Sequence, residues 1–319
     1  MSASDDARWL AAAACLAERA RPQSRPNPAV GAILVKDRVV VGRGWTRAGG
    51  RPHAEAMALV QAGADARGAT LYVTLEPCAH RSQRGPACAD LVAEAGIARA
   101  VVGVADPDPR TAGAGIARLA AEGIAADLAD DEACRASLAG YLAWAALGRP
   151  HVTLKLAVTA DGLIARPDGS SKWITGEPAR AHVHRERARC DAILVGGGTL
   201  RADAPRLDVR LPGLEERSPR RLVLTGGEAP PGWQALSGPD QIRGLAEVQY
   251  LFVEGGAAVA GAFLAAGLVD RLLLYRAPVE FGEGIAAFRD PGPDGVPAGW
   301  RRADRRRLGS DTLEVYHPA

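Results

Sequence analysis

The segments GGRPHAE at residues 49–55 and VTLEPC at residues 73–78 decide how the first half of this chain is interpreted. His53 opens a predicted helix, Cys78 follows a predicted strand, and Cys88 lies ten residues further along the chain. One imidazole and two thiolates match the three protein ligands of a catalytic zinc site, which leaves its fourth position open for water. The sequence therefore predicts a zinc site held by His53, Cys78 and Cys88.

Glu55 lies two residues after His53 and is expected to act on the water rather than on the metal. Zinc lowers the pKa of a water that it binds, so that hydroxide becomes available near neutral pH. A carboxylate beside that water can accept its proton and pass it to a ring nitrogen of a substrate. An H-x-E pair with a later P-C-x-x-C segment is the signature of zinc-dependent deaminases, and this chain has its H-x-E pair and its Pro-Cys. Glu55 is thus predicted to be the catalytic residue of a hydrolytic deamination.

Two alternatives are unrelated buried cysteines with a histidine at a helix start, and a closed structural zinc site. Such a site has four protein ligands, and His80 is a candidate for the fourth. A structural site would leave Glu55 without a task, which favours the catalytic interpretation. The remaining cysteines lie in predicted apolar elements or at their edges and are interpreted as small core residues; they are Cys15, Cys134 and Cys190.

Helices and strands are predicted to alternate through the first half of the chain, which indicates an α/β layer structure. The predicted helices are 5–20, 54–63, 87–95, 113–122 and 130–147, and the predicted strands are 29–35, 38–44, 70–74, 100–104 and 124–128. The last helix meets Gly148-Arg149-Pro150, and glycine followed closely by proline is a helix stop signal. We therefore expect two domains, 1–148 and 149–319.

The second half is also predicted to be α/β. Its expected strands are 151–158, 192–195, 221–225, 250–253, 271–275 and 312–316, its expected helices are 178–189 and 257–266, and 226–246 is expected to be mostly loop. No G-x-G-x-x-G motif follows the first of these strands, which argues against a Rossmann domain. Two glycine-rich turns do follow strands, at residues 196–199 and 254–256. Such turns let backbone N–H groups approach phosphate oxygens.

Composition limits the class of protein. Hydrophobic residues make up 47% and charged residues 24% of the 319 residues, which suits about two globular domains. The net charge of +2 argues against a nucleic-acid binder. The arginine run at 301–307 is interpreted as a solvated face, and an odd count of five cysteines argues against a disulfide scaffold.

Membrane and targeting signals are not expected either. No apolar run reaches the roughly 18 residues that a membrane span needs. Asp5 and Asp6 precede the apolar stretch 9–17 where a signal peptide would carry basic residues, so we expect an amphipathic helix there. A cytoplasmic location follows from these expectations.

The N-terminal motifs together resemble the bifunctional pyrimidine deaminase/reductase family of riboflavin biosynthesis, the RibD family. The matching strings are NPAVG (27–31), GGRPHAE (49–55), VTLEPCAH (73–80) and DPDP (106–109). The nine residues between Cys78 and Cys88 also differ from the two found in nucleoside deaminases. The resemblance implies a cytidine-deaminase-like α/β/α domain in which Asn27 and His80 help to hold the pyrimidine. Without the family, a turn explains Asn27 in Asn-Pro equally well.

The resemblance continues through DG (161–162), SKWIT (171–175), TLRADAPRLDVR (199–210), VEGG (253–256) and GLVD (267–270). It implies a second α/β domain similar to dihydrofolate reductase. The residues implied to contact NADPH are Ala157, Trp173, Thr199, Asp203, Gly256, Ala257, Ala258, Val259, Ala260, Gly261 and Ala262. The residues implied to contact substrate are Ser171, Arg187, Leu207, Arg210 and Glu254. Among these, Arg187 and Arg210 would hold a ribose phosphate with their guanidinium forks.

The function implied by the resemblance has two steps that use Zn²⁺ and NADPH. Diaminohydroxyphosphoribosylaminopyrimidine would be deaminated, and 5-amino-6-(5-phosphoribosylamino)uracil would then be reduced to the ribitylamino product. The expected partner is this phosphoribosylated small molecule, with neither nucleic acid nor membrane, and a homo-oligomer formed through the reductase domain is left open. Two other interpretations also stay open: a zinc deaminase of another amino-heterocycle with a degenerate reductase domain, and a zinc-stabilised binding module without turnover.

The chain departs from the family pattern at a few positions. Thr46 stands where some relatives have a substrate-contacting histidine, and Ala204 replaces a frequent aspartate. The segment between the predicted strands 221–225 and 250–253 is short, and Gly226 stands where a serine-like cofactor contact is usual. The sequence therefore predicts a working but weakened NADPH site.

Overall fold

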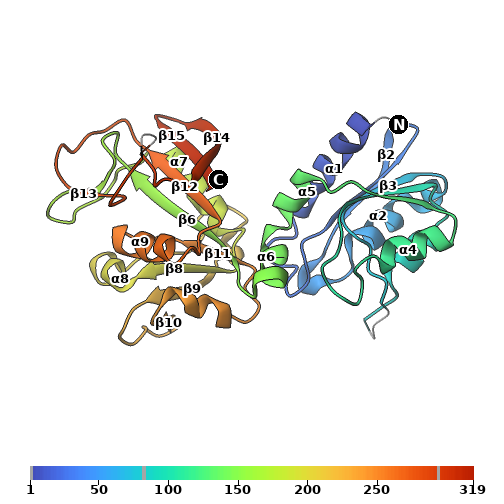
Figure 1. Ribbon diagram of the computed structural model, residues 1–319, viewed down its shortest axis with the longest axis horizontal. Coiled ribbons are helices and arrows are strands. Elements are labelled where there is room, and N and C mark those ends of the chain that lie inside the picture. Colours follow the sequence, from blue (N-terminus) through green and yellow to red (C-terminus); the bar gives the residue numbers. More distant parts are fainter. Residues whose placement is uncertain (1–2, 81–83, 293–294) are drawn as a thin grey trace. The chain divides into compact units, whose positions relative to one another are not determined.

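The computed structural model describes residues 3–80, 84–292 and 295–319. It divides the chain into two compact units, 1–148 and 149–319 (Figure 1). Gly148 ends the last helix of the first unit with φ 61° and ψ 29°. This left-handed conformation carries no steric penalty for glycine, so the helix stops here and the chain enters the second unit.

The first unit is built on a five-stranded sheet in the order β2-β1-β3-β4-β5. The strands are β1 (Gly31–Lys36), β2 (Val39–Trp45), β3 (Thr70–Leu75), β4 (Arg99–Val104) and β5 (Ala125–Leu128). β1 is antiparallel to both β2 and β3, whereas β3, β4 and β5 run parallel. Asp37 and Arg38 both have positive φ in the hairpin turn, as a two-residue turn between twisted antiparallel strands requires.

Helices cover both faces of this sheet, as Figure 1 shows. α1 (Ala3–Ala17) and α5 (Glu132–Ser137) pack on one face. On the other lie α2 (Ala54–Ala62), α3 (Cys88–Glu94) and α4 (Ala114–Ala121), with the short 3₁₀ helices Ala48–Gly50 and Gly63–Ala66 nearby in the chain. The expected α/β/α layering of the N-terminal domain is confirmed.

The helix predicted over 130–147 is wrong as one element, because it is broken in two. α5 ends at Ser137, and α6 (Ala139–Leu147) follows after Leu138, whose φ of −98° and ψ of 4° lie outside the helical region. The Asp131 side chain accepts a hydrogen bond from the backbone N–H of Cys134 and caps α5. The break separates the two helices, and residues of α6 line the first cavity described below.

The second unit is built on an eight-stranded sheet in the order β10-β9-β8-β11-β6-β12-β15-β14. These strands are β6 (His151–Val158), β8 (Ala192–Gly196), β9 (Arg220–Leu224), β10 (Gln234–Leu236), β11 (Tyr250–Val253), β12 (Arg271–Arg276), β14 (Trp300–Leu308) and β15 (Asp311–Pro318). The strands from β10 to β12 run parallel, and β15 and β14 continue the sheet antiparallel. The expected α/β class of this domain is confirmed.

Several elements of the second unit differ from the sequence expectation. The predicted turn 196–199 opens a helix, α8 (Gly197–Asp203), and the predicted loop 226–246 contains β10 and the 3₁₀ helix Pro239–Gly244. The arginine run forms the edge strand β14, whose middle residues are exposed. Further elements are α7 (Glu177–Arg187), α9 (Ala257–Ala265), the 3₁₀ helix Glu215–Arg217, and the small sheet of β7 (Leu163–Ala165) with β13 (Ile285–Ala286).

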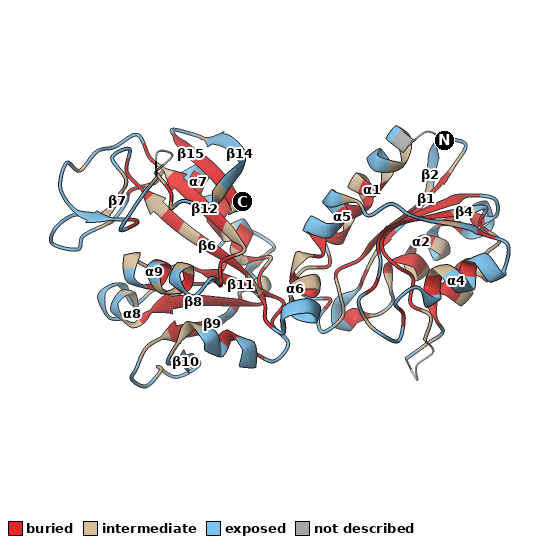
Figure 2. Ribbon diagram, in the orientation of Figure 1, coloured by how far each residue is buried: buried red, intermediate tan, exposed pale blue. Residues whose placement is uncertain are grey.

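Each unit has its own hydrophobic core, and Figure 2 shows the buried residues concentrated along the sheets. The central strands β3, β8 and β11 are buried at every position, as expected of strands covered on both faces. Across the described residues, the helices are all too short or too polar to pass through a lipid bilayer. The two cavities described below lie at the ends of these strands, where loops leave the sheets.

Candidate active sites

The three predicted zinc ligands converge in the first unit. His53 immediately precedes α2, Cys78 follows β3, and Cys88 is the first residue of α3. His53 Nδ1 lies 3.3 Å from Cys88 Sγ and 3.6 Å from Cys78 Sγ. The three ligand atoms all lie within 4.8 Å of one another, which is the spacing that a single tetrahedral metal ion requires.

The donor set fits a catalytic zinc site. His80, the candidate fourth ligand of a closed structural site, is not part of the metal-ligating group; its Nδ1 lies 3.4 Å from Thr111 Oγ1 instead. Over the described ranges, His53, Cys78 and Cys88 form a group of three donors, and His53 and Cys78 line a cavity of about 580 Å³. Three ligands beside a cavity leave a position for water, so the structure favours the catalytic interpretation.

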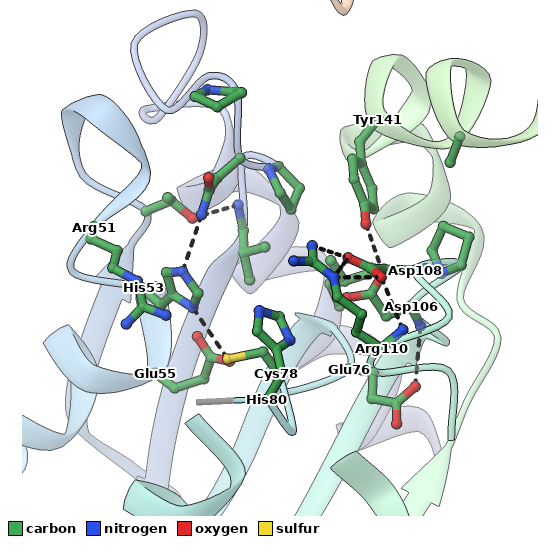
Figure 3. A pocket seen from close by; sticks show the side chains of 18 of the residues that line it. Arg51, His53, Glu55, Glu76, Cys78, His80, Asp106, Asp108, Arg110 and Tyr141 are labelled. Carbon is green, nitrogen blue, oxygen red and sulfur yellow. Dashed lines mark hydrogen bonds and ion pairs between the residues drawn. The ribbon is translucent and has the colours of Figure 1, made fainter. Parts of the chain in front are cut away.

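Glu55 is 3% exposed and lies beside the ligands on the first turn of α2 (Figure 3). Burial raises the pKa of its carboxyl group, although the positive charge of His53 opposes the shift. A raised pKa allows a carboxyl group to take up a proton and release it again near neutral pH. The position and environment of Glu55 therefore suit the proton transfers of a deamination.

The two thiols occupy different electrostatic environments. The pKa of Cys78 is lowered by a hydrogen bond from the Cys88 thiol and by its contact with His53. The backbone N–H of Cys88 also donates to Cys78 Sγ over 3.3 Å. The pKa of Cys88 is raised because its thiol donates a hydrogen bond to Cys78 and because this thiol is buried. Burial lowers the pKa of His53, but the hydrogen bond with Cys78 and the nearby negative charges of Glu55 and Cys78 together raise that pKa overall.

Asn27 lies against the far side of the His53 ring. Its Nδ2 is 3.2 Å from His53 Nε2 and also donates to the carbonyl oxygen of Gly50 over 3.2 Å. A Cβ atom on Gly50 would come within 2.5 Å of the Asn27 side chain, and Gly50 has φ 85°. Glycine is therefore required at position 50 so that Asn27 can fix the orientation of the ring while lining the same cavity.

The opposite wall of the cavity consists of residues to which the sequence analysis gave no role. Figure 3 shows Asp106, Asp108, Arg110 and Tyr141 facing His53 and Arg51 across the cavity. The hydroxyl group of Tyr141, on α6, donates to Asp106 Oδ1 over 2.7 Å. The DPDP motif was a usable signal for the aspartates. Tyr141 carries no sequence signal, because it reaches the cavity only through the break between α5 and α6.

Glu76 fixes that wall from behind. Its buried carboxylate accepts hydrogen bonds from four backbone N–H groups, at 3.2, 3.0, 2.9 and 3.1 Å; these belong to Asp106, Gly113, Gly115 and Ile116. The irregular segment from Asp106 to Gly113 and the first turn of α4 are thereby held in place. On the other wall, Thr46 Oγ1 accepts a hydrogen bond from the backbone N–H of Val30 over 3.0 Å. The hydroxyl group of Thr46 is therefore used to hold the backbone.

A second cavity, of about 450 Å³, lies in the second unit at the ends of β6, β8 and β11. The implied substrate residues line it: Ser171, Arg187, Leu207, Arg210 and Glu254. So do five of the implied cofactor residues: Ala157, Trp173, Thr199, Asp203 and Gly256. Parallel α/β sheets commonly bind ligands at this end of their strands. Trp173 is 71% exposed, so its side chain is available to a ligand rather than part of the core.

The rest of the implied cofactor segment, from Ala257 to Ala262, belongs to α9. The backbone N–H groups of its first three residues have no intrahelical partner by position, whereas the N–H of Ala260 already bonds to the carbonyl of Gly256. Val259 and Ala260 are buried, and their side chains pack in the core. At this helix, only the backbone N–H groups of its first residues are therefore available to bind an anionic group.

The second cavity also contains a charge cluster that the sequence analysis identified only in part. Arg187 forms a two-pronged ion pair with Glu254, with its Nε and Nη2 at 2.6 and 3.0 Å from the carboxylate oxygens. Lys155 Nζ lies 3.9 Å from the same carboxylate. Burial lowers the pKa of Lys155, whereas the two cations lower that of Glu254 against its own burial. Lys155 was missed, although it is the lone charge in the apolar strand β6.

The same division into two parts emerges from comparison with known protein families. Residues 3–104 match the model of the cytidine and deoxycytidylate deaminase zinc-binding region. Residues 150–237 and 241–313 match that of the RibD C-terminal domain. A RibD riboflavin biosynthesis protein of Aquifex aeolicus is 36% identical, over 88% of this chain and 89% of its own.

The chain belongs to the RibD family. Solved structures agree: Acinetobacter baumannii RibD superposes with a TM-score of 0.87 at 32% identity over 99% of both chains. A Thermotoga maritima protein described as a diaminohydroxyphosphoribosylaminopyrimidine deaminase/5-amino-6-(5-phosphoribosylamino)uracil reductase superposes with 0.86 at 31% identity, over 98% of this chain and 99% of its own. The chain is thus a RibD-type deaminase and reductase of riboflavin biosynthesis, with a zinc-binding domain and an NADPH-dependent one.

Proposed function

We propose that residues 1–148 deaminate diaminohydroxyphosphoribosylaminopyrimidine and that residues 149–319 reduce 5-amino-6-(5-phosphoribosylamino)uracil to the ribitylamino product. The observation that carries this proposal is the convergence of His53, Cys78 and Cys88 beside the buried carboxyl group of Glu55. The phosphoribosylated pyrimidine is the proposed partner, and the cytoplasm is the proposed location.

In the first unit, His53, Cys78 and Cys88 would hold the zinc ion, which supplies Lewis acidity towards a water molecule. Glu55 would accept a proton from that water at its carboxylate and donate it to a pyrimidine ring nitrogen. Attack of the water oxygen on the amino-bearing ring carbon forms a C–O bond. Glu55 then takes the remaining proton of the new hydroxyl group and passes it to the amino group, the C–N bond breaks, and ammonia leaves while the ring carbon becomes a carbonyl. Asn27 and His80 would hold the pyrimidine, since both line the cavity above the ligands.

In the second unit, NADPH supplies a hydride for the ribose C1, and the chain binds and positions both reactants. The residues proposed for NADPH are Ala157, Trp173, Thr199, Asp203 and the start of α9, where free N–H groups favour a pyrophosphate. The residues proposed for substrate are Ser171, Arg187, Leu207, Arg210 and Glu254. Lys155 and Arg187 form ion pairs with the carboxylate of Glu254 and hold it in place at the edge of the cavity.

The test uses the purified full-length chain with zinc. Ammonia release from the diaminopyrimidine ribotide measures the first step, and NADPH oxidation with the deaminated ribotide measures the second. We expect both. Ammonia release without NADPH oxidation, at saturating NADPH, would leave only a deaminase with a degenerate second domain. If zinc is bound but neither signal appears, the proposal fails and a binding module replaces it.

A further inference from the structure

We propose that Arg180 is a positioning residue of the reductase site. Its guanidinium group covers one face of the Trp173 indole and so holds this ring in place for the nicotinamide of NADPH. The inference rests on the proposed contact between Trp173 and NADPH. It goes beyond that contact, because neither the motifs nor the family resemblance gave Arg180 a role.

The contact between the two side chains is a cation–π contact. Arg180 Cζ lies 5.1 Å from the centroid of the Trp173 ring, which is within the range of about 6 Å for such contacts. Arg180 Nη1 also donates a hydrogen bond to the carbonyl oxygen of Thr175. The backbone two residues beyond the indole therefore holds the guanidinium group that lies over it. Arg180, Trp173 and Thr175 all line the second cavity.

The Trp173 ring needs such a contact because it lies on the surface. The residue is 71% exposed, so core packing does not fix the orientation of its side chain. Within the described part of the chain, the contact with Arg180 is the one stacking contact of this ring. Holding a mobile side chain still costs free energy when a ligand binds, and a contact made beforehand removes that cost. Arg180 thus prepares one face of the indole and leaves the other face for a ligand.

The backbone on either side of Trp173 is held independently of Arg180. Lys172 Nζ lies 3.1 Å from Asp203 Oδ1, at the end of α8. Ile174 is 9% exposed and belongs to the protein interior. Loss of the Arg180 side chain should therefore release the indole ring while its backbone stays in place.

The neighbours of Trp173 indicate which end of NADPH the ring meets. Ser171, which is proposed to contact substrate, lies two residues earlier in the chain and lines the same cavity. Hydride passes directly from the nicotinamide to the ribose carbon, so the nicotinamide must lie beside the substrate. A flat ring stacked on the open face of the indole at this point is therefore the nicotinamide rather than the adenine.

The experiment measures the Kd of NADPH for the full-length chain by calorimetry, without substrate. We expect Arg180→Ala to raise this Kd about two- to fivefold, as loss of a cation–π contact at an exposed position implies. Arg180→Lys keeps a cation but not the planar fork, so it should recover part of the loss. Arg185→Ala is the matched control, because Arg185 is an exposed arginine of α7 that does not line the cavity. It should bind NADPH as the wild type does.

A double-mutant cycle tests whether Arg180 acts through the ring. Trp173→Ala should weaken NADPH binding, and adding Arg180→Ala to it should cause no further loss, because the ring that Arg180 positions is already absent. Full additivity of the two losses would overturn the proposal, since Arg180 would then act on the cofactor independently of Trp173.

Adenosine 2′,5′-bisphosphate, which lacks the nicotinamide, is the second probe. Its Kd should be the same for wild type, Arg180→Ala and Trp173→Ala, which also shows that the variants are folded. A weaker Kd for this probe in Arg180→Ala alone would assign Arg180 to a phosphate group and overturn the positioning role.

The remaining outcomes separate this inference from the function on which it rests. If Trp173→Ala weakens NADPH binding but Arg180→Ala does not, the positioning role fails alone. If Trp173→Ala leaves the Kd of NADPH unchanged, the proposed contact fails and the positioning role fails with it. If the expected pattern is found but NADPH is never oxidised with the deaminated ribotide, the reductase function fails and the positioning role stands.

Discussion

At the scale of single residues, we propose that two side chains have separate tasks in the deaminase site, and that Glu55 transfers the proton. Glu55→Gln keeps a similar shape but cannot exchange protons. Because general acid–base groups contribute about 10²–10⁴-fold and Glu55 serves several transfers, we expect ammonia release to fall by about 10⁴-fold. Zinc content and NADPH oxidation with deaminated substrate should remain. A deaminase rate within about tenfold of wild type would remove Glu55 from the mechanism.

Cys88 is proposed to bind the metal rather than to transfer the proton. Cys88→Ser removes one of three ligands, and the remaining pair of donors is too few for a stable zinc site. Metal analysis should show a large loss of zinc, together with loss of ammonia release. Cys15→Ser is the control, since Cys15 is an exposed free cysteine. Full zinc and full deamination in Cys88→Ser would sink the assignment.

Gly226 offers a gain-of-function test of the prediction that the NADPH site is weakened. A Cβ atom there would meet no other atom within 4 Å, so a serine side chain fits without displacing its neighbours. If the missing contact is a hydrogen bond, Gly226→Ser should tighten NADPH binding by about two- to tenfold. Titration of NADPH against the chain's fluorescence measures this. Gly226→Ala supplies the added carbon without the hydroxyl group, and an equal gain in both variants would show that no hydrogen bond is involved.

At the scale of elements, the segment from Asp106 to Ile116 depends on Glu76. Glu76→Gln keeps the side chain's shape but replaces one carboxylate oxygen by an amide group that cannot accept. At least one buried N–H then loses its partner, at a cost of about 1–3 kcal/mol. We expect the deaminase KM to rise several-fold with zinc content unchanged, together with a lower melting temperature. Unchanged KM at a lowered melting temperature would assign Glu76 to stability alone.

The elements also show how far the sequence could be interpreted. Hydrophobic alternation and glycine stops predicted the sheets and most helices, because burial of a strand or helix face leaves a periodic pattern. The break at Leu138 and the strand β14 escaped prediction, since Leu138 is an ordinary helix-forming residue and an edge strand of exposed arginines has no apolar alternation. The zinc ligands were found from motif spacing. Tyr141 and Glu76 were not, because tertiary contacts alone give them their roles.

At the scale of the whole molecule, the second unit begins with a buried ion pair between Arg149 and Asp270. Arg149 donates to both oxygens of Asp270 over 2.6 and 2.8 Å, and the N–H of Val152 donates to the same carboxylate over 2.8 Å. Arg149 is 6% exposed. The first residue of the unit is therefore tied to the start of β12, which follows more than a hundred residues later in the chain.

Acid should weaken this ion pair. Burial opposes the charge of Asp270, but the hydrogen bond from Arg149 and the nearby charge of His151 lower its pKa below the ordinary 3.8. A carboxyl group whose pKa is lowered on folding stabilises the folded state above its unfolded pKa, and that contribution is lost as the pH falls through the folded value. Asp270→Asn should lower the free energy of unfolding by about 3 kcal/mol at neutral pH. In urea titrations the difference from wild type should shrink below about pH 4, and a constant difference would contradict the linkage.

The exposed edge strand β14 has a consequence for how the protein behaves in concentrated solution. An unpaired strand edge offers a row of backbone donors and acceptors to any passing extended chain. Here five arginines, Arg301, Arg302, Arg305, Arg306 and Arg307, stand along that edge. A second copy approaching edge to edge would bring like charges together, so the large sheet resists growing into an aggregate from this side. Polyanions that neutralise these arginines would remove the protection and promote precipitation.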